Sequence, residues 1–247
     1  MISSKVFGVF RCKFSTGRAL WGSKPRNLKG KKTSSQEWIK RQLSDPYVKR
    51  ARTENYRCRS AFKLLEIDDK YRLLQPGGVV IDCGAAPGSW TQVAVERVLS
   101  SAQSENETDK LKGLVIGIDL NHMTPIEGAF ILHQSDFTAL QTQEKIVKIL
   151  GGRPVDLVLS DMAPRASGQK FMDHELIVEL CFSVLRFGVT VLRPGGHLLC
   201  KLWQGGEQRK LESAMQSVFE SVKVVKPDSS RSDSAEIFLL GRNLRGC

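Results

Sequence analysis

Short apolar runs that end in small or acidic residues alternate with helical segments along this chain. The first run, Val79–Asp82, contains β-branched residues and leads directly into a glycine loop. From residue 90 to residue 98, apolar side chains then recur at helical spacing. After a polar stretch at 100–112, which we expect to form a surface loop, Leu114–Asp119 is a second apolar run. A strand, a glycine loop, a helix and another strand in this order predict a βα unit of a parallel sheet.

The same alternation continues to the end of the chain. Further strands are predicted at Phe130–Leu132, Val155–Ser160, His197–Lys201, Val222–Val225 and Glu236–Leu240. A helix over Leu176–Leu185 separates the second and third of these strands. The pattern predicts an α/β fold with a mostly parallel sheet, helices on both faces and an antiparallel pair at its end. We see no internal repeat and no second domain.

The loop after the first strand, residues 82–90, reads Asp-Cys-Gly-Ala-Ala-Pro-Gly-Ser-Trp. Its small residues allow a ligand to approach the backbone closely at the carboxyl end of the sheet. It differs from the GxGxxG of dinucleotide-binding proteins and lacks the lysine of a P-loop, which disfavours a pyrophosphate ligand. We predict cofactor contacts from Cys83, Gly84, Ala85, Ala86, Pro87, Gly88, Ser89 and Trp90.

Acidic residues follow the next two strands. Asp119 ends the second strand, where a carboxylate accepts hydrogen bonds from both hydroxyls of a ribose. Asp136 follows the third strand and is placed to accept a hydrogen bond from an amino group such as adenine N6. Either residue alone could merely solvate a strand end. Together with the loop they describe a nucleoside site without a phosphate requirement, and we predict S-adenosylmethionine as the cofactor.

Two later strands end in charged residues at the same edge of the sheet. Asp161 follows the fourth strand, and Lys201 lies in the otherwise apolar fifth strand. A lysine in such a strand is costly to bury unless it has a partner. Glu236 opens the last strand, and Lys63 lies on a predicted helix before the sheet. Taken singly, each of these residues could be a structural ion pair or a solvated charge.

These segments together resemble the FtsJ/RlmE-type ribosomal RNA 2′-O-methyltransferases. The resemblance is carried by YRCRSAFKL at 56–64, DCGAAPGSW at 82–90, SDMAP at 160–164, CKLWQG at 200–205, and KPDSSR at 226–231 followed by AEIFLL at 235–240. It covers nearly all of residues 40–241, with every motif in order. It implies a single Rossmann-like, class I S-adenosylmethionine-dependent methyltransferase domain with a mostly parallel seven-stranded sheet. We expect this RNA methyltransferase domain to occupy residues 37–247.

The resemblance also implies the catalytic residues. The family uses a Lys-Asp-Lys-Glu tetrad, whose members correspond to Lys63, Asp161, Lys201 and Glu236. Lys201 is then the general base that removes the proton of the target 2′-hydroxyl, and Asp161 also borders the cofactor site. Positioning and proton removal supply most of the rate, because the sulfonium is already a reactive methyl donor. No metal is required.

The first 36 residues differ sharply in charge from the rest. They hold nine of the 37 Lys and Arg residues and none of the 26 acidic ones, so of the net +11 only +2 belongs to the remaining body. An acid-free, Arg- and Ser-rich leader with scattered apolar residues is typical of a mitochondrial transit peptide, and we predict localisation in the matrix. The alternative is a disordered basic tail that touches RNA.

Cysteine spacing and hydropathy exclude other classes. The six cysteines stand at 12, 58, 83, 181, 200 and 247, with no CxxC pair, which argues against a zinc module or a disulfide scaffold and fits a reducing compartment. The longest apolar stretch, Leu180–Leu192, is interrupted by Arg186. We therefore predict no membrane span and no metal site.

Basic residues gather between positions 40 and 63. We expect phosphate contacts from Arg50, Arg52, Arg57 and Arg59, extended from another loop by Arg165. The alternative is a solvated charged face. Because the body carries little net charge, we expect weak binding to free RNA, and we hypothesise that the substrate is an assembling ribosomal particle.

Within the family, the basic leader makes the chain most similar to the animal mitochondrial member. This implies methylation of a uridine ribose in mitochondrial large-subunit rRNA, in support of large-subunit assembly. Ribose methylation of a transfer RNA or an mRNA cap stays open, since it uses the same tetrad. A non-catalytic ribosome-assembly or RNA-binding factor on this fold is a second alternative. A nicotinamide-dependent oxidoreductase is disfavoured by the absence of GxGxxG.

Overall fold

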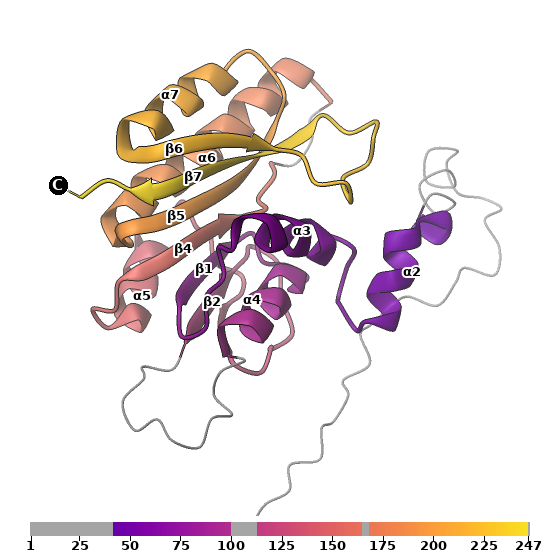
Figure 1. The fold of residues 1–247 in the computed structure, drawn as a ribbon, viewed down its shortest axis with the longest axis horizontal. Helices are drawn as coiled ribbons and strands as arrows, with labels where there is room; N and C mark the ends of the chain where they lie inside the picture. Colours follow the sequence, from indigo (N-terminus) through magenta and orange to yellow (C-terminus); the bar gives the residue numbers. More distant parts are fainter. Residues whose placement is uncertain (1–41, 100–112, 165–167, 247) are drawn as a thin grey trace, which may run out of the picture.

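The computed structural model describes residues 42–99, 113–164 and 168–246 (Figure 1). The predicted leader, the predicted surface loop at 100–112 and Arg165 lie outside these residues. In the described ranges, no helix has the length and apolarity that a bilayer crossing requires.

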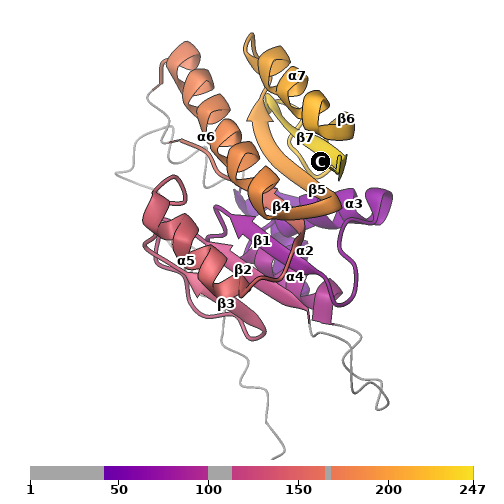
Figure 2. The same ribbon diagram turned by 90° about the vertical axis from the view of Figure 1, so that its left-hand side faces the viewer.

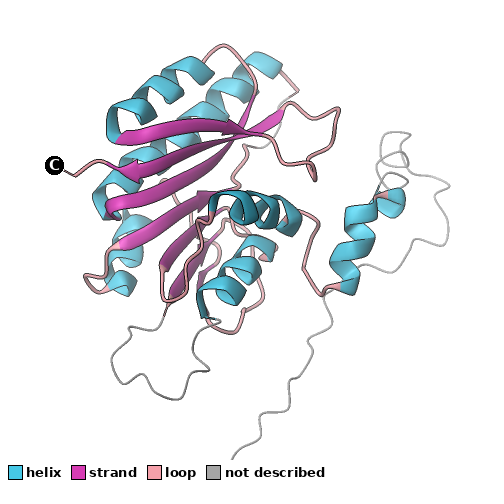
Figure 3. Cartoon of the chain, in the orientation of Figure 1, coloured by secondary structure: helices cyan, strands magenta, loops and turns pink. Residues whose placement is uncertain are grey.

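Within the described ranges, seven strands form one sheet in the order β3-β2-β1-β4-β5-β7-β6. Figure 3 shows the strands of this sheet in magenta, with helices in cyan around them. Strands β1 to β5 pair in parallel, and β7 runs antiparallel to both of its neighbours, β5 and β6. The predicted α/β class, the mostly parallel sheet and the antiparallel pairing at its end are therefore confirmed. The strands are β1 (Val79–Cys83), β2 (Leu114–Ile118), β3 (Ala129–Leu132), β4 (Val155–Ser160), β5 (Leu192–Trp203), β6 (Phe219–Val225) and β7 (Glu236–Leu244).

Helices cover both faces of the sheet, as Figure 2 shows from its edge. One apolar core lies under α5 (Leu140–Leu150), α6 (Lys170–Val191) and α7 (Gln208–Val218). A second core, on the opposite face, lies under α2 (Pro46–Thr53), α3 (Ala61–Tyr71) and α4 (Ser89–Leu99). All five residues of β1 are buried, because a strand covered on both faces contacts helices through both rows of side chains.

Several boundaries differ from the sequence expectation. Helices α2, α5 and α7 were not predicted. For α2 the sequence does contain a helix-start signal, the pair Asp45 and Pro46. The Asp45 carboxylate accepts hydrogen bonds from the amides of Tyr47 and Val48, and Pro46 occupies the first turn. Strand β5 begins at Leu192, five positions before the predicted start, because a shift in its pairing with β4 admits the Pro-Gly-Gly segment at 194–196.

The position of the site follows from the crossover at β1. The chain leaves β1 toward α4 on one face of the sheet and leaves the neighbouring β4 toward α6 on the other. The two connections diverge at the carboxyl ends of these strands and leave a crevice between them. In open α/β sheets, ligands bind at this switch point.

Candidate active site

A cavity of about 250 Å³ opens at the carboxyl ends of β1, β2, β3 and β4. It brings together five of the predicted cofactor residues: Gly84, Ala86, Asp119, Asp136 and Asp161. The other lining residues were not predicted from the sequence as site residues; they are Ile118, Leu120, Asn121, Ser135, Phe137, Met162, Ala163 and Leu180. Most of these residues lie in the segment that follows a predicted strand. This position at the carboxyl end of a strand is the sequence signal by which they could have been predicted.

Gly84 allows the chain to turn tightly at the floor of this cavity. Its φ is +79°, and a Cβ atom there would lie 2.8 Å from the Met162 backbone nitrogen. The amides of Gly84 and Ala85 both donate to the Ile118 carbonyl, at 2.9 and 3.0 Å. The glycine thus permits β1, β2 and the segment after β4 to converge where a ligand would approach the backbone.

Two carboxylates in the cavity are oriented by neighbouring groups. Asp119 accepts a hydrogen bond from the Ala86 amide at 2.8 Å on Oδ2 and from the Asn121 amide at 2.7 Å on Oδ1. Asp136, at the exposed rim, accepts from the amide and hydroxyl of Thr138. Asp119 Oδ1 also accepts from the Asn121 side-chain amide at 2.9 Å, so its remaining capacity for a ribose hydroxyl lies on Oδ2. Both Asp136 bonds fall on Oδ1, which leaves its Oδ2 for an amino group. These acceptors fit the hydroxyl and amino donors of the adenosyl part of S-adenosylmethionine.

The remaining loop residues support this cavity from outside its lining. Cys83 and Ala85 are buried in the sheet and under the loop. Trp90 is buried, and its indole N–H donates to the Ser60 carbonyl at 2.8 Å. The Ser89 hydroxyl lies 2.9 Å from that of Ser60. The loop is therefore fixed to the segment before α3. Gly84 and Ala86 line the cavity, and the cofactor contacts of the whole loop stay predictions.

Asp82, the last residue but one of β1, is a buried acid that the sequence analysis did not assign to the site. Its Oδ2 accepts a hydrogen bond from the Thr91 hydroxyl at 2.7 Å, and among the described residues its Oδ1 has no partner. Burial raises the pKa of Asp82 to about 7; the Thr91 hydrogen bonds oppose this rise, and the charges of Asp161 and Asp119 add to it. Three carboxyl groups thus lie close together on adjacent strands, an arrangement that favours a cationic ligand.

The predicted tetrad forms two lysine–acid pairs. The Lys201 ammonium lies 3.0 Å from Asp161 Oδ1 and donates to the Asp161 carbonyl at 2.5 Å. The Lys63 ammonium lies 2.6 Å from Glu236 Oε1 and 2.8 Å from Oε2. Their side chains are only 11% to 20% exposed, so these pairs lie in a partly desolvated environment.

Glu236 links the two pairs electrostatically. Burial raises the pKa of this carboxyl, but the Lys63 charge and hydrogen bond, a hydrogen bond from Ser230 and the charge of Lys201 together lower it below its ordinary value. The Ser230 hydroxyl donates to Oε1 at 2.9 Å. Glu236 is therefore ionised at neutral pH, and both lysines act on the same carboxylate.

A second cavity, also of about 250 Å³, lies on the other side of the tetrad. Lys63 and Glu236 line it, together with Gln42, Arg59, Arg231 and Ser234. Asp161 lines the first cavity, so the two lysine–acid pairs stand between the two spaces. This arrangement can present a nucleophile from one side to a donor on the other. Across the described ranges, no group of three or more His, Cys, Asp or Glu side chains could hold a metal ion.

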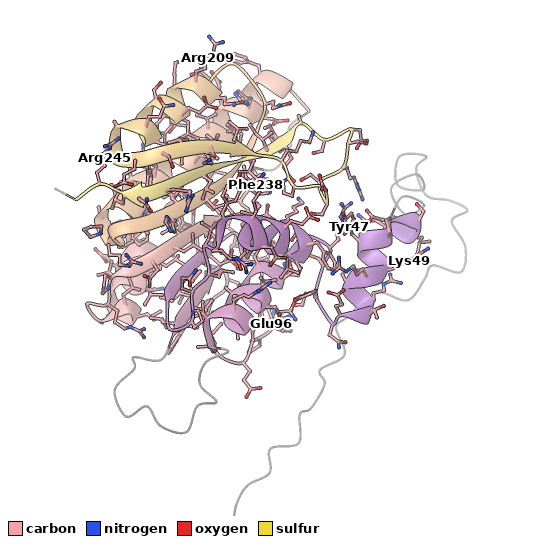
Figure 4. All side chains as sticks on the ribbon, viewed as in Figure 1. Tyr47, Lys49, Glu96, Arg209, Phe238 and Arg245 are labelled. Atoms are coloured by element: carbon pink, nitrogen blue, oxygen red, sulfur yellow. The ribbon has the colours of Figure 1, made fainter. Side chains whose placement is uncertain are left out.

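The arginines predicted to contact RNA differ in the contacts that they make within the protein. Arg50 is exposed, pairs with Glu54 and lies over the Phe62 ring at 4.3 Å. Arg52 is exposed on α2. Arg59 pairs with Asp45 and donates to the Ser229 carbonyl. On α2, Tyr47 faces α3 and packs 5.6 Å from the Phe62 ring, whereas Lys49 points outward (Figure 4).

The fold and the site together define a class I methyltransferase. A Rossmann-like sheet with β7 as its antiparallel strand carries a cavity at the carboxyl ends of β1–β4 that no lysine lines, and a lysine–acid pair stands beside that cavity. The chain belongs to the FtsJ-like methyltransferase family, which it matches over residues 56–244. The family expected from the sequence motifs is thereby confirmed.

Relatives from animals and bacteria agree with this assignment. The chain is 53% identical over 222 residues to rRNA methyltransferase 2, mitochondrial, of Drosophila melanogaster, covering 90% of this chain and 88% of that protein. It is 47% identical over 221 residues to ribosomal RNA large subunit methyltransferase E of Cereibacter sphaeroides, with the same coverage. A crystal structure described as a ribosomal RNA methyltransferase of Plasmodium falciparum superimposes with a TM-score of 0.66 at 31% identity, covering 78% of this chain and all of that one.

Proposed function

We propose that this protein transfers a methyl group from S-adenosylmethionine to the ribose 2′-oxygen of a uridine in mitochondrial large-subunit rRNA, in support of subunit assembly. The observation that carries the proposal is the Lys201–Asp161 pair, which stands between a nucleoside cavity and a basic cavity. The names of the fly and bacterial relatives support ribosomal RNA as the substrate. The fly relative's name and the acid-free leader at 1–36 support the mitochondrial matrix.

The first cavity would hold the cofactor. Asp119 would accept a hydrogen bond from the ribose, Asp136 would accept one from the adenine amino group, and Gly84 would leave room for the rest of the cofactor beside the backbone. Asp161 would place negative charge beside the cavity that holds the sulfonium. When bound, S-adenosylmethionine supplies a methyl group already activated for attack.

The tetrad positions and activates the ribose. Lys201, as the neutral amine, would accept the proton of the 2′-hydroxyl at Nζ. Bound S-adenosylmethionine would supply the methyl group to that oxygen, with cleavage of its carbon–sulfur bond and release of S-adenosylhomocysteine. Asp161 orients Nζ through its carboxylate and its carbonyl. Lys63 and Glu236 line the second cavity, where they hold the ribose by donating and accepting hydrogen bonds.

RNA phosphates would lie across the α2 side of the second cavity. The exposed guanidinium groups of Arg50 and Arg52 would contact them, and Arg59 and Arg231 line the cavity itself. The small net charge of the body gives weak attraction for free RNA, which supports a preassembled ribosomal particle as the working substrate.

Ribose-methylation mapping of mitochondrial large-subunit rRNA tests the proposal. We expect one 2′-O-methyl group to disappear on loss of the protein and to return with wild type but not with Lys201→Ala. An unchanged map with defective ribosomes would support the non-catalytic assembly role instead. An unchanged map with normal ribosomes would mean that the RNA is a different one.

A second comparison tests the state of the substrate. Methylation of a naked transcript and of a particle isolated from cells lacking the protein should differ strongly in rate at physiological salt. Equal turnover on the two would refute the particle as the preferred substrate and leave the chemistry unaffected.

A further inference from the structure

Arg57 joins three segments of the chain at the outer side of the cofactor loop. Its Nη1 donates hydrogen bonds to the Pro87 carbonyl at 2.9 Å and to the Thr124 carbonyl at 2.8 Å. Its Nη2 donates to the Pro125 carbonyl at 2.8 Å. These acceptors lie 30, 67 and 68 positions away in sequence. Three of the five donors of one guanidinium are thus committed to backbone oxygens.

The backbone segment that carries Arg57 is itself hydrogen-bonded to α4. The Arg57 amide donates to the Gln92 side-chain carbonyl at 2.8 Å, and the Gln92 side-chain amide donates to the Asn55 carbonyl at 3.0 Å. The Tyr56 hydroxyl donates to Glu96 at 2.8 Å, and Figure 4 shows Glu96 on α4. The guanidinium therefore projects from a segment held on a regular helix, so its position is well defined.

Both loops that Arg57 holds contribute to the cofactor cavity. Pro87 directly follows Ala86, which lines the cavity and donates to Asp119. Thr124 and Pro125 belong to the segment that begins with Asp119 at the end of β2. A Cβ atom on Gly88 would lie 2.9 Å from Nη1, so the cofactor loop packs directly against the guanidinium. Moving Arg57 would change the spacing of two walls of the cavity.

We propose that Arg57 is a positioning residue for the cofactor, which sets the separation of the loop at 84–88 from the segment after β2, and that it does not act as an RNA phosphate contact. The inference rests on the proposed use of S-adenosylmethionine. It follows from the three hydrogen bonds of the guanidinium, because N–H groups that already donate to backbone carbonyls do not bind phosphate oxygens as well. Two nitrogens are needed to keep all three bonds, because Nη1 joins the two loops while Nη2 binds the Pro125 carbonyl. The single ammonium of a lysine, on a shorter side chain, does not reproduce this set.

Lysine and alanine substitutions separate the two roles. Arg57→Lys keeps the positive charge and loses the fork, whereas Arg57→Ala loses both. Positioning predicts that both variants raise the Kd for S-adenosylmethionine and for S-adenosylhomocysteine by about tenfold, as expected for the loss of hydrogen bonds that fix a site. The KM for RNA and its salt dependence should stay at the wild-type values. A phosphate contact predicts instead that Arg57→Lys behaves like wild type and that Arg57→Ala raises the KM for RNA and flattens its salt dependence.

The measurements are cofactor titration calorimetry and steady-state methylation on one RNA substrate, at a temperature where circular dichroism shows each variant folded. Arg52→Ala is the matched control, since it removes an exposed arginine from the same basic stretch and should leave both cofactor Kd values unchanged. Wild-type cofactor affinity in Arg57→Lys would overturn the inference alone. Failure of the wild-type protein to bind S-adenosylmethionine would overturn the proposed function, and the inference with it.

Discussion

The Lys201 ammonium contacts Asp161 at two points, its carboxylate oxygen at 3.0 Å and its backbone carbonyl at 2.5 Å. Register explains the contact, because Ser160 of β4 pairs with Cys200 of β5 and the next residue of each strand then lies at the same edge of the sheet. The Asp161 amide in turn donates to the Cys83 carbonyl of β1. The Lys201 ammonium is therefore positioned by the register of β4 and β5 and by the hydrogen bond that joins Asp161 to β1.

Removal of Lys201 should abolish transfer without loss of cofactor binding. We expect Lys201→Ala to lower the single-turnover rate by about 1,000-fold, the usual scale of a general base. Lys201→Arg should be equally slow, because a guanidinium keeps the charge and does not accept a proton at neutral pH. Rapid-quench methylation with tritiated cofactor measures the rate. A fast Lys201→Arg enzyme would show that only the positive charge is needed.

Glu236 should contribute a pH-dependent part of stability. Its folded pKa lies below the ordinary 4.5, so the stabilisation is complete above pH 4.5 and is lost as the pH falls through the folded value. We expect the difference in free energy of unfolding between wild type and Glu236→Gln to shrink as the pH is lowered below 4.5. Urea denaturation across a pH series measures it. The exposed Glu127→Gln is the control, and a difference that does not change with pH would contradict the ion-pair interpretation.

Asp82, in contrast to Glu236, should lower the stability of the folded state as the pH rises. Its folded pKa of about 7 lies above the ordinary 3.8, so the folded state holds an extra proton between these values and loses stability as the pH rises through them. We expect Asp82→Asn to gain in Tm relative to wild type from about pH 4 to about pH 7, and to keep a constant advantage above that. Differential scanning fluorimetry measures this, with the exposed Asp228→Asn as control. Parallel Tm curves for wild type and Asp82→Asn would argue against a neutral buried acid.

Gly84 should be intolerant of any side chain. Its φ of +79° and the nearby Met162 backbone both oppose a Cβ atom. Gly152 has a similar φ of +83° and nothing within 4 Å, so Gly152→Ala reports the backbone cost alone. We expect about 1 kcal/mol of destabilisation at Gly152 and about 3 kcal/mol at Gly84, where overpacking adds to it. Chemical denaturation measures both, and calorimetry should show loss of cofactor binding in Gly84→Ala only. Equal destabilisation by Gly84→Ala and Gly152→Ala would contradict the inference that a Cβ atom at position 84 clashes with the Met162 backbone.

The periodic part of the fold was predictable because the strands are buried on both faces. Such strands are continuous apolar runs, and β1, β2, β4 and β7 were all located from that signal within a few residues. Helices α2, α5 and α7 were missed. The helical pattern of α7 is interrupted by polar residues on its exposed side, and only Leu211 and Met215 are buried. An amphipathic stripe of two residues is too short to stand out in a sequence.

The pairing of charged residues and the shape of the cavities could not be predicted from the sequence in this way. Three carboxylates at strand ends could be located along the chain, but the orphaned Oδ1 of Asp82 results from burial under α4. Arg57 and Arg59 belong to a basic run that predicts phosphate contacts. In the folded protein their donors bind carbonyls and Asp45. Which partner a guanidinium takes depends on segments distant in sequence.

The α/β class, the glycine loop, the family and the four residues that correspond to its tetrad could be predicted from the sequence, because each is encoded in a local motif or in the periodicity of burial. The pairing of Lys201 with Asp161 and of Lys63 with Glu236, the two cavities beside these pairs, and the hydrogen bonds of Arg57 to the cofactor loop became visible only in the folded chain. These relations join residues that are 30 to 173 positions apart. They follow from strand order and register, which bring together side chains that no local pattern connects.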